Sequence, residues 1–212
     1  MKPAAAAGFT LVEVLVALMV MAIMAVMAWQ GVDGIVRARD SNQDRLERSL
    51  RLNTVISQWE QDLAALQETS AVPSALSFDG ASVRLVRRSG GGLQLVVWSL
   101  QPDGGVNHWL RWAGPVVTTS GGLQESWLRS QQFQGSEPGQ LRTLAGVSQW
   151  QVYFFITNTW ANAQSTGNVA LPAAGASAAA RVALPNGVRL VLSFAPDSGQ
   201  SGSLIRDTLL SP

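Results

Sequence analysis

The chain has 212 residues and a formal net charge of +1, with 47% hydrophobic and 14% charged residues. Nucleic-acid-binding proteins normally carry a basic excess on one face, so this balance does not indicate a polyanionic partner. The chain contains no cysteine, which excludes disulfides, thiolate metal sites and cysteine nucleophiles. His108 is the one histidine, so a histidine-rich metal site is also excluded, and we expect it at a half-exposed strand position.

The first predicted element is an apolar helix over residues 9–29, interrupted by one ionisable side chain, Glu13. A helix of this length spans about 30 Å, which matches the hydrocarbon core of a bilayer. A secretory signal carries its small-residue cleavage site after the apolar core, whereas here the small residues 4–8 precede it. The sequence therefore predicts a membrane-spanning helix that a cut at Gly8 would leave on the mature chain.

The stretch GFTLVEVLVAL at residues 8–18 resembles the class III signal of type IV pilins and pseudopilins. In that family a prepilin peptidase cuts after the glycine and methylates the new N-terminus. The resemblance implies a leader of residues 1–8, cleavage between Gly8 and Phe9, and N-methylation of Phe9. It further implies a single-pass protein of the bacterial inner membrane, with its C-terminal body in the periplasm.

Glu13 needs an explanation, because an ionisable side chain inside a membrane is costly unless it is paired. The resemblance implies that its partner is the methylated N-terminal amine of an adjacent subunit in a filament. Glu13 would then be an assembly residue that aligns the subunit along the filament. The alternative interpretation places Glu13 at the headgroup boundary, where its carboxylate is merely solvated.

A periplasmic helical stalk is predicted over residues 30–70, where Gly31 and Gly34 should soften the helix beyond the bilayer. Apolar residues then recur at helical spacing along one stripe, which we expect to pack on the body; the opposite face carries Arg, Asp, Glu and Gln. The stripe consists of Leu52, Val55, Ile56, Trp59, Leu63 and Leu66. The helix should end near Glu68 to Ser70, before Pro73.

Residues 71–212 are predicted to form a β-rich globular body, which makes the whole chain a pilin-like α+β protein. Short runs rich in β-branched and aromatic residues indicate strands near residues 82–88, 93–100, 106–112, 147–156, 187–194 and 202–210. Glycine-rich turns at 89–92 and 102–105 favour antiparallel hairpins. Residues 113–146 remain unassigned, and the Ala/Gly/Ser-rich residues 161–187 indicate a long surface loop.

Tryptophan is abundant, and its positions predict two different roles. Trp98, Trp109 and Trp150 fall within predicted strands, as does Trp112, and packing in the core is the expected role for them. Trp127 and Trp160 lie beside loops, where either could anchor an interface with another protein.

Within the pilin-like superfamily the chain is similar to the minor pseudopilins J of type II secretion systems. The similarity lies in MAWQGVDGIVRARD, LVVWSLQPDGGVNHWLRW, LRTLAGVSQWQVYFF and LPNGVRLVLSF, in that order. It implies a structural protein without catalytic residues, cofactor, metal, small-molecule substrate or nucleic acid. Its partners would be the minor pseudopilins I, K and H, the major pseudopilin and the prepilin peptidase. Together the minor pseudopilins would form a tip complex that primes pseudopilus assembly for secretion across the outer membrane.

Three alternatives remain open from the sequence. A W-like minor pilin of a type IV pilus shares the N-terminal motif and the stalk. A membrane-tethered periplasmic enzyme is disfavoured, because the body has neither a Gly-x-Ser-x-Gly motif nor metal-ligand spacing, and its carboxylates are far apart in sequence. The third alternative is an ordinary secreted protein with an unusual signal.

Overall fold

The computed structural model describes residues 8–133, 135, 137–166, 184–196, 198–200 and 202–210. The chain divides into two compact units, Met1–Ser49 and Leu50–Pro212. The long helix α1, Leu11–Ala64, contributes residues to both units. The predicted leader, apart from Gly8, and most of the predicted loop 161–187 lie outside the described residues.

The first unit contains the apolar part of α1, whose described side chains are almost all exposed to the surroundings. By length and composition this is a helix that can cross a membrane. Gly31 and Gly34, where softening is predicted, lie within α1 without interrupting it. Arg37 and Asp33 form an ion pair of 2.7 Å one turn apart, as expected for the polar surface of a helix.

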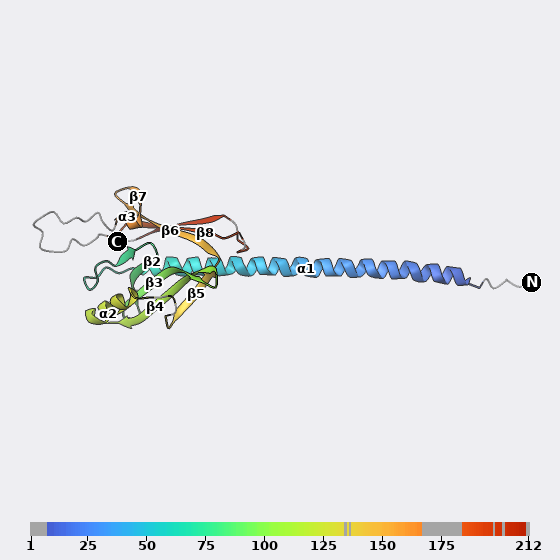
Figure 1. The fold of residues 1–212 in the computed structure, drawn as a ribbon, viewed down its shortest axis with the longest axis horizontal. Helices are drawn as coiled ribbons and strands as arrows, with labels where there is room; N and C mark the ends of the chain where they lie inside the picture. The colour runs from blue at the N-terminus through green and yellow to red at the C-terminus, as the bar shows by residue number, and fades with distance from the viewer. Residues whose placement is uncertain are drawn as a thin grey trace, which may run out of the picture. The chain divides into compact units, whose positions relative to one another are not determined.

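The second unit is built around two antiparallel sheets, which confirms the predicted α+β class (Figure 1). The first sheet has the order β1-β2-β3-β4-β5, with β1 Leu76–Phe78, β2 Ser82–Ser89, β3 Gly92–Asp103, β4 Val106–Val117 and β5 Gln140–Ala145. The second has the order β7-β6-β8-β9, with β6 Val147–Ile156, β7 Thr159–Asn162, β8 Gly187–Phe194 and β9 Ser203–Leu209. Two further helices are α2, Ser120–Ser130, and α3, Ala163–Thr166.

All six predicted strands are present, and the two predicted turns are tight hairpins. Gly90 and Gly91 join β2 to β3, and Gly104 and Gly105 join β3 to β4. All four have positive φ, the conformation that a two-residue turn with the twist of its strands requires. Of the predicted loop 161–187, residues 161–162 instead end β7, residues 163–166 form α3, and residue 187 begins β8.

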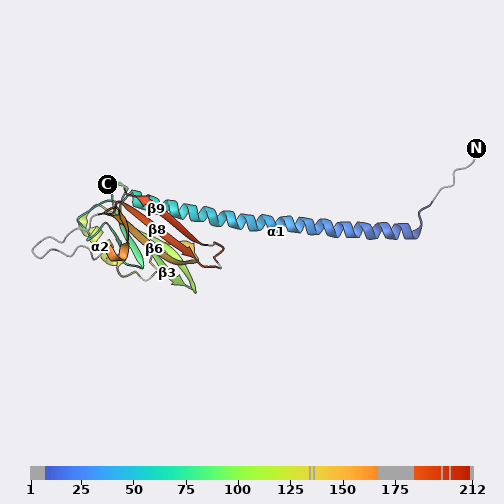
Figure 2. The same ribbon diagram turned by 90° about the horizontal axis from the view of Figure 1, so that it is seen from above.

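The main core lies between the two sheets and includes the last turns of α1. The predicted stripe is confirmed as core packing: Val55, Ile56, Trp59 and Leu63 are buried. Trp59 contacts Trp98 of β3 and Trp109 of β4 at ring-centroid distances of 5.6 and 5.7 Å. Figure 2 shows β6, β8 and β9 side by side in the sheet that closes the other side of this core.

A second core cluster explains part of the unassigned stretch 113–146, because α2 covers the opposite face of the first sheet. Thr119 caps α2 by accepting a hydrogen bond from the backbone N–H of Gly122. Leu123 and Trp127, one turn apart, pack against β2, β3 and Trp112. The suggestion that Trp127 anchors an interface is therefore wrong, since its side chain is only 8% exposed. Trp112, by contrast, is a core residue as predicted, together with the other three strand tryptophans.

The helix α1 ends at Ala64, four residues before the predicted range. The chain leaves the helix there because its backbone pairs with β2. The N–H of Gln67 donates to the carbonyl of Val86 at 2.9 Å, and the N–H of Arg88 donates to the carbonyl of Ala65 at 2.8 Å. Pairing with the sheet, and not Pro73, terminates the helix.

Asp62 is fully buried between α1 and the first sheet, although the sequence pattern assigns the aspartates of this helix to its polar face. Its Oδ1 accepts from Arg87 at 2.7 Å and from Arg111 at 2.9 Å, and its Oδ2 accepts from Arg111 at 2.8 Å. The indole N–H of Trp98 donates to Oδ2 at 2.9 Å. Because β2, β3 and β4 each supply one of these donors, a single carboxylate joins three adjacent strands to the helix.

We predict that Asp62→Asn lowers the free energy of unfolding by about 3–5 kcal/mol, because it leaves two arginines without their buried counter-charge. Chemical unfolding of the full chain in detergent, followed by tryptophan fluorescence, measures the change. Asp103→Asn is the matched control, since the Asp103–Arg142 pair is exposed and should contribute less than about 1 kcal/mol. Equal effects of the two substitutions would contradict a special role for Asp62.

Candidate assembly site at the N-terminus

The residues that carry the predicted processing and assembly roles lie at the start of α1. Gly8, Phe9 and Thr10 precede the helix, and Glu13 lies in its first turn. Phe9 is 88% exposed, and an added Cβ at Gly8 would meet no atom within 4 Å. The Gly8–Phe9 peptide bond is therefore not enclosed by any described part of the chain.

Thr10 and Glu13 bond each other reciprocally. The Oε2 atom of Glu13 accepts from the backbone N–H of Thr10 at 2.9 Å and from its hydroxyl at 2.9 Å. The backbone N–H of Glu13 donates to Thr10 Oγ1 at 3.3 Å. This is a capping box, which satisfies N–H groups that have no partner within the first turn of a helix.

The capping box gives Glu13 a local structural role that the sequence analysis missed. The sequence does contain the signal: a threonine and a glutamate, separated by two residues, stand before an apolar run. This spacing by itself marks a helix start. Both side-chain bonds use Oε2, and among the described residues no group donates to Oε1. Glu13 can therefore cap its own helix and still accept a hydrogen bond from a donor on another molecule.

The body offers no comparable constellation of reactive groups in its described part. No three His, Asp or Glu side chains of the described residues gather as metal ligands. His108 lies half-buried on β4, as predicted. It is opposite Gln101 of β3 and Ala145 of β5 in the sheet register, with no carboxylate in either place.

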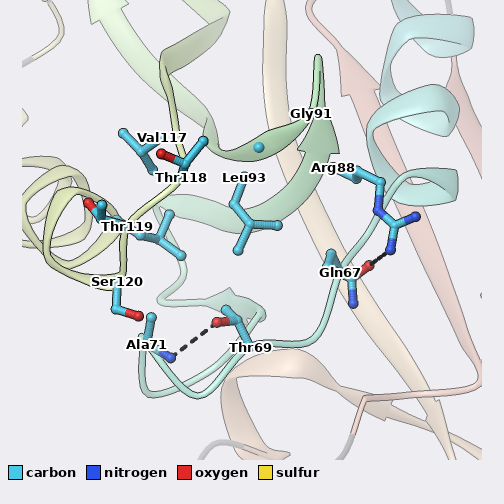
Figure 3. Close-up of a pocket in the computed structure, with 12 residues that line it drawn as sticks. Gln67, Thr69, Ala71, Arg88, Gly91, Leu93, Val117, Thr118, Thr119 and Ser120 are labelled. Atoms are coloured by element: carbon cyan, nitrogen blue, oxygen red, sulfur yellow. Dashed lines mark hydrogen bonds between the residues drawn. The ribbon is translucent and has the colours of Figure 1, made fainter.

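A cavity of about 530 Å³ opens between the hairpin β2–β3 and the start of α2 (Figure 3). Arg88 is the charged residue of its lining, and it donates to Gln67 Oε1 at 2.8 Å. Thr69 Oγ1 accepts from the backbone N–H of Ala71 at 3.1 Å. The remaining lining residues are small, hydroxyl-bearing or aliphatic, so the cavity contains no acid–base pair.

The comparison with known families agrees with this N-terminal site. A family model described as the prokaryotic N-terminal methylation motif matches residues 4–29, which include Gly8, Phe9, Glu13 and the apolar segment. A search of curated proteins found no match. The motif supports a protein of the type IV pilin kind with a structural role, and the apolar helix that follows it fits a single-pass membrane anchor.

Proposed function

We propose that this chain is a minor pseudopilin of a type II secretion system, which assembles with the minor pseudopilins I, K and H at the tip of the pseudopilus. One observation carries the proposal: the methylation motif opens directly into a single helix long and apolar enough to cross a membrane. The choice of the J branch rests on the ordered similarity of the four sequence stretches given above. In this role the protein primes pseudopilus assembly, and it performs no catalysis.

The proposal places the chain in the inner membrane, with its body in the periplasm, before assembly. A prepilin peptidase cuts between Gly8 and Phe9 and methylates Phe9. The apolar part of α1 stays with the mature protein, because the cut precedes it. The helix then exchanges its lipid surroundings for neighbouring helices of the filament.

Glu13 is the residue that makes this exchange specific. In an apolar environment an unpaired carboxylate is costly, so the methylated amine of a neighbouring subunit is its natural partner. The capping box holds the side chain in place while Oε1 accepts from that amine. Pairing is possible only when the two chains are aligned along the filament, so it selects one axial offset.

Intact-mass analysis of the full chain tests the processing. Co-expression with a prepilin peptidase should remove residues 1–8 and add one methyl group to Phe9, and omission of the peptidase should leave the precursor. Gly8→Ala should block the cut, because the peptidase reads the glycine. Cleavage near Ala28 would instead remove the apolar helix and indicate an ordinary secreted protein.

We predict that Glu13→Ala abolishes pseudopilus assembly and secretion without changing the stability of the body. The reason is that Glu13 makes its side-chain bonds within the first turn of α1. Secretion of a reporter exoprotein and thermal unfolding of the purified full chain provide the two measurements. Asp33→Asn, on the exposed surface of the same helix, is the control and should secrete normally. A wild-type level of assembly in Glu13→Ala would contradict the pairing.

Co-purification identifies the assembly. The processed full chain in detergent should form a stable heteromer with the I and K pseudopilins of the same organism. Binding to the minor pilins of a type IV pilus, with no binding to I and K, would contradict the type II secretion role and favour the W-like alternative.

A further inference from the structure

The strand β9 differs from the other sheet edges in the described part of the chain. β1 and β7 are short edges of three and four residues. On the edge β5 two backbone carbonyls are already occupied, because Arg51 of α1 donates to that of Thr143 at 2.8 Å and to that of Arg142 at 3.2 Å. β9 is seven residues long and has its pairing with β8 on one side.

Two hydrogen bonds fix which backbone groups of β9 point away from the sheet. The N–H of Leu210 donates to the backbone carbonyl of Asn186, and the backbone N–H of Phe194 donates to the carbonyl of Gly202. These two bonds lie at the two ends of an unbroken antiparallel register. In an antiparallel ladder, residue pairs that are joined by backbone hydrogen bonds alternate with pairs that are not. Because both end bonds involve even-numbered residues, the even-numbered residues of β9 bond to β8. The N–H and C=O groups of Ser203, Ile205, Asp207 and Leu209 therefore point toward the open edge.

The side chains of β9 divide in the same way. Leu204 packs on the main core, and Arg206 forms an ion pair with Glu60 of α1. On the outer face, Ile205 is 59% exposed and Leu209 is 81% exposed, with Asp207 between them. The inner face thus holds the strand in place, while the outer face presents two aliphatic side chains beside unpaired backbone groups.

Charged residues normally protect an edge strand from pairing with another chain, but the two charges of β9 are already engaged. Asp207 accepts two hydrogen bonds from Arg189 of β8, at 2.7 and 2.6 Å, and Arg206 is bound to Glu60. The Arg189 guanidinium lowers the pKa of Asp207, so this carboxylate stays ionised and paired. Arg189 is itself held over the Trp160 ring at 4.3 Å.

We propose that the open edge of β9 is a docking site for an extended strand of another protein, which adds a fifth strand to the second sheet. Main-chain hydrogen bonds to Ser203, Ile205, Asp207 and Leu209 provide the binding, as in other cases of strand addition. The added strand carries apolar side chains opposite Ile205 and Leu209, and a basic side chain opposite Asp207. Opposite charges directly across a ladder stabilise the pair.

A second copy of this chain does not fit the edge. In two-fold antiparallel pairing, the register that aligns all seven residues places Arg206 opposite Arg206 of the other copy. An axis moved by one residue toward the C-terminus, which slips the register by two residues, places Asp207 opposite Asp207. Because Arg206 and Asp207 are already paired with Glu60 and Arg189, each tolerates a neutral or an opposite charge across the ladder. Identical charges directly opposite each other destabilise a ladder. An axis at Ile205 aligns only residues 203–207 of the two strands and leaves Leu209, the more exposed of the two outer aliphatic side chains, outside the overlap.

Photo-crosslinking of the full chain in its native cells tests the proposal. Benzoylphenylalanine at position 209 should give an adduct with one other protein, and the mapped peptide should alternate apolar residues around a Lys or Arg. The same label at Val191, which lies on β8 opposite Ile205, is the matched control and should give little adduct. An adduct between two copies, an equally strong adduct from position 191, or no adduct at 209 would each overturn the proposal.

Two substitutions at one position separate backbone pairing from side-chain contact. Ile205→Pro removes an outward N–H without removing a bond to β8, a position at which edge strands accept proline, and should reduce the adduct about tenfold or more. Ile205→Thr keeps the N–H and the strand preference, and should reduce it less than about fivefold. Equal losses in both variants would contradict strand addition.

Thermal unfolding of both variants confirms that the body remains folded. Should Ile205→Pro unfold it, Ser203→Pro at the start of β9, which likewise removes an outward N–H, replaces it in the comparison, because position 209 carries the label. Docking of a strand on β9 does not depend on the assembly to which the chain belongs. Failure to co-purify with I and K would contradict the type II secretion proposal alone, whereas absence of the adduct at position 209 would contradict strand docking alone.

Discussion

The buried carboxylate of Asp62 is the constraint on which the arrangement of the body depends. It accepts hydrogen bonds from Gln58, Arg87, Arg111 and Trp98, so each of its oxygens is occupied. The network extends outward, since Arg87 also donates to Gln94 and Gln94 donates to the carbonyl of Gly114. A buried ion pair adds little net stability compared with apolar packing, but it penalises every arrangement that leaves one member unpaired.

This penalty is what fixes α1 against the first sheet. Val55, Ile56, Trp59 and Leu63 alone could pack in several rotations of the helix, because apolar contacts have no direction. A rotation by one residue would turn Asp62 by about 100° and separate it from Arg87 and Arg111. The carboxylate therefore selects one rotation, and the aromatic cluster around Trp59 fills the space that this rotation leaves.

Much of the fold could be predicted from the sequence because its strongest patterns are local. The helical stripe of α1, the glycine-rich hairpin turns and the tryptophans of β3, β4 and β6 all lie where their spacing indicated. Asp62 shows the limit of such reasoning. It occurs three residues after Trp59, within the stripe, yet a charged residue is assigned to the solvent face unless its partners are known. Those partners, Arg87 and Arg111, are 25 and 49 residues away in the sequence.

The missed elements have a related explanation. α2 contains two glycines and three serines in eleven residues, so its helical propensity is low, and it is held by the packing of Leu123 and Trp127. Because α2 covers one face of the first sheet and α1 the other, β4, which the sequence predicts only as far as residue 112, buries four consecutive residues and gives no simple in-and-out pattern from which its continuation could be predicted. The short strands β1 and β7 carry too few residues to show a period.

Two carboxylates of this chain show how hydrogen bonding distinguishes a structural acid from one available to a partner. Asp62 has donors on both oxygens, all from its own chain, and has no capacity left for another molecule. Glu13 uses Oε2 for its own helix, while Oε1 has no donor among the described residues. In an apolar environment a free acceptor is costly, and a donor on another molecule removes that cost. The same capping box that stabilises the helix start therefore leaves Oε1 of Glu13 available to a donor on another molecule, which is the pairing that we propose with a neighbouring subunit.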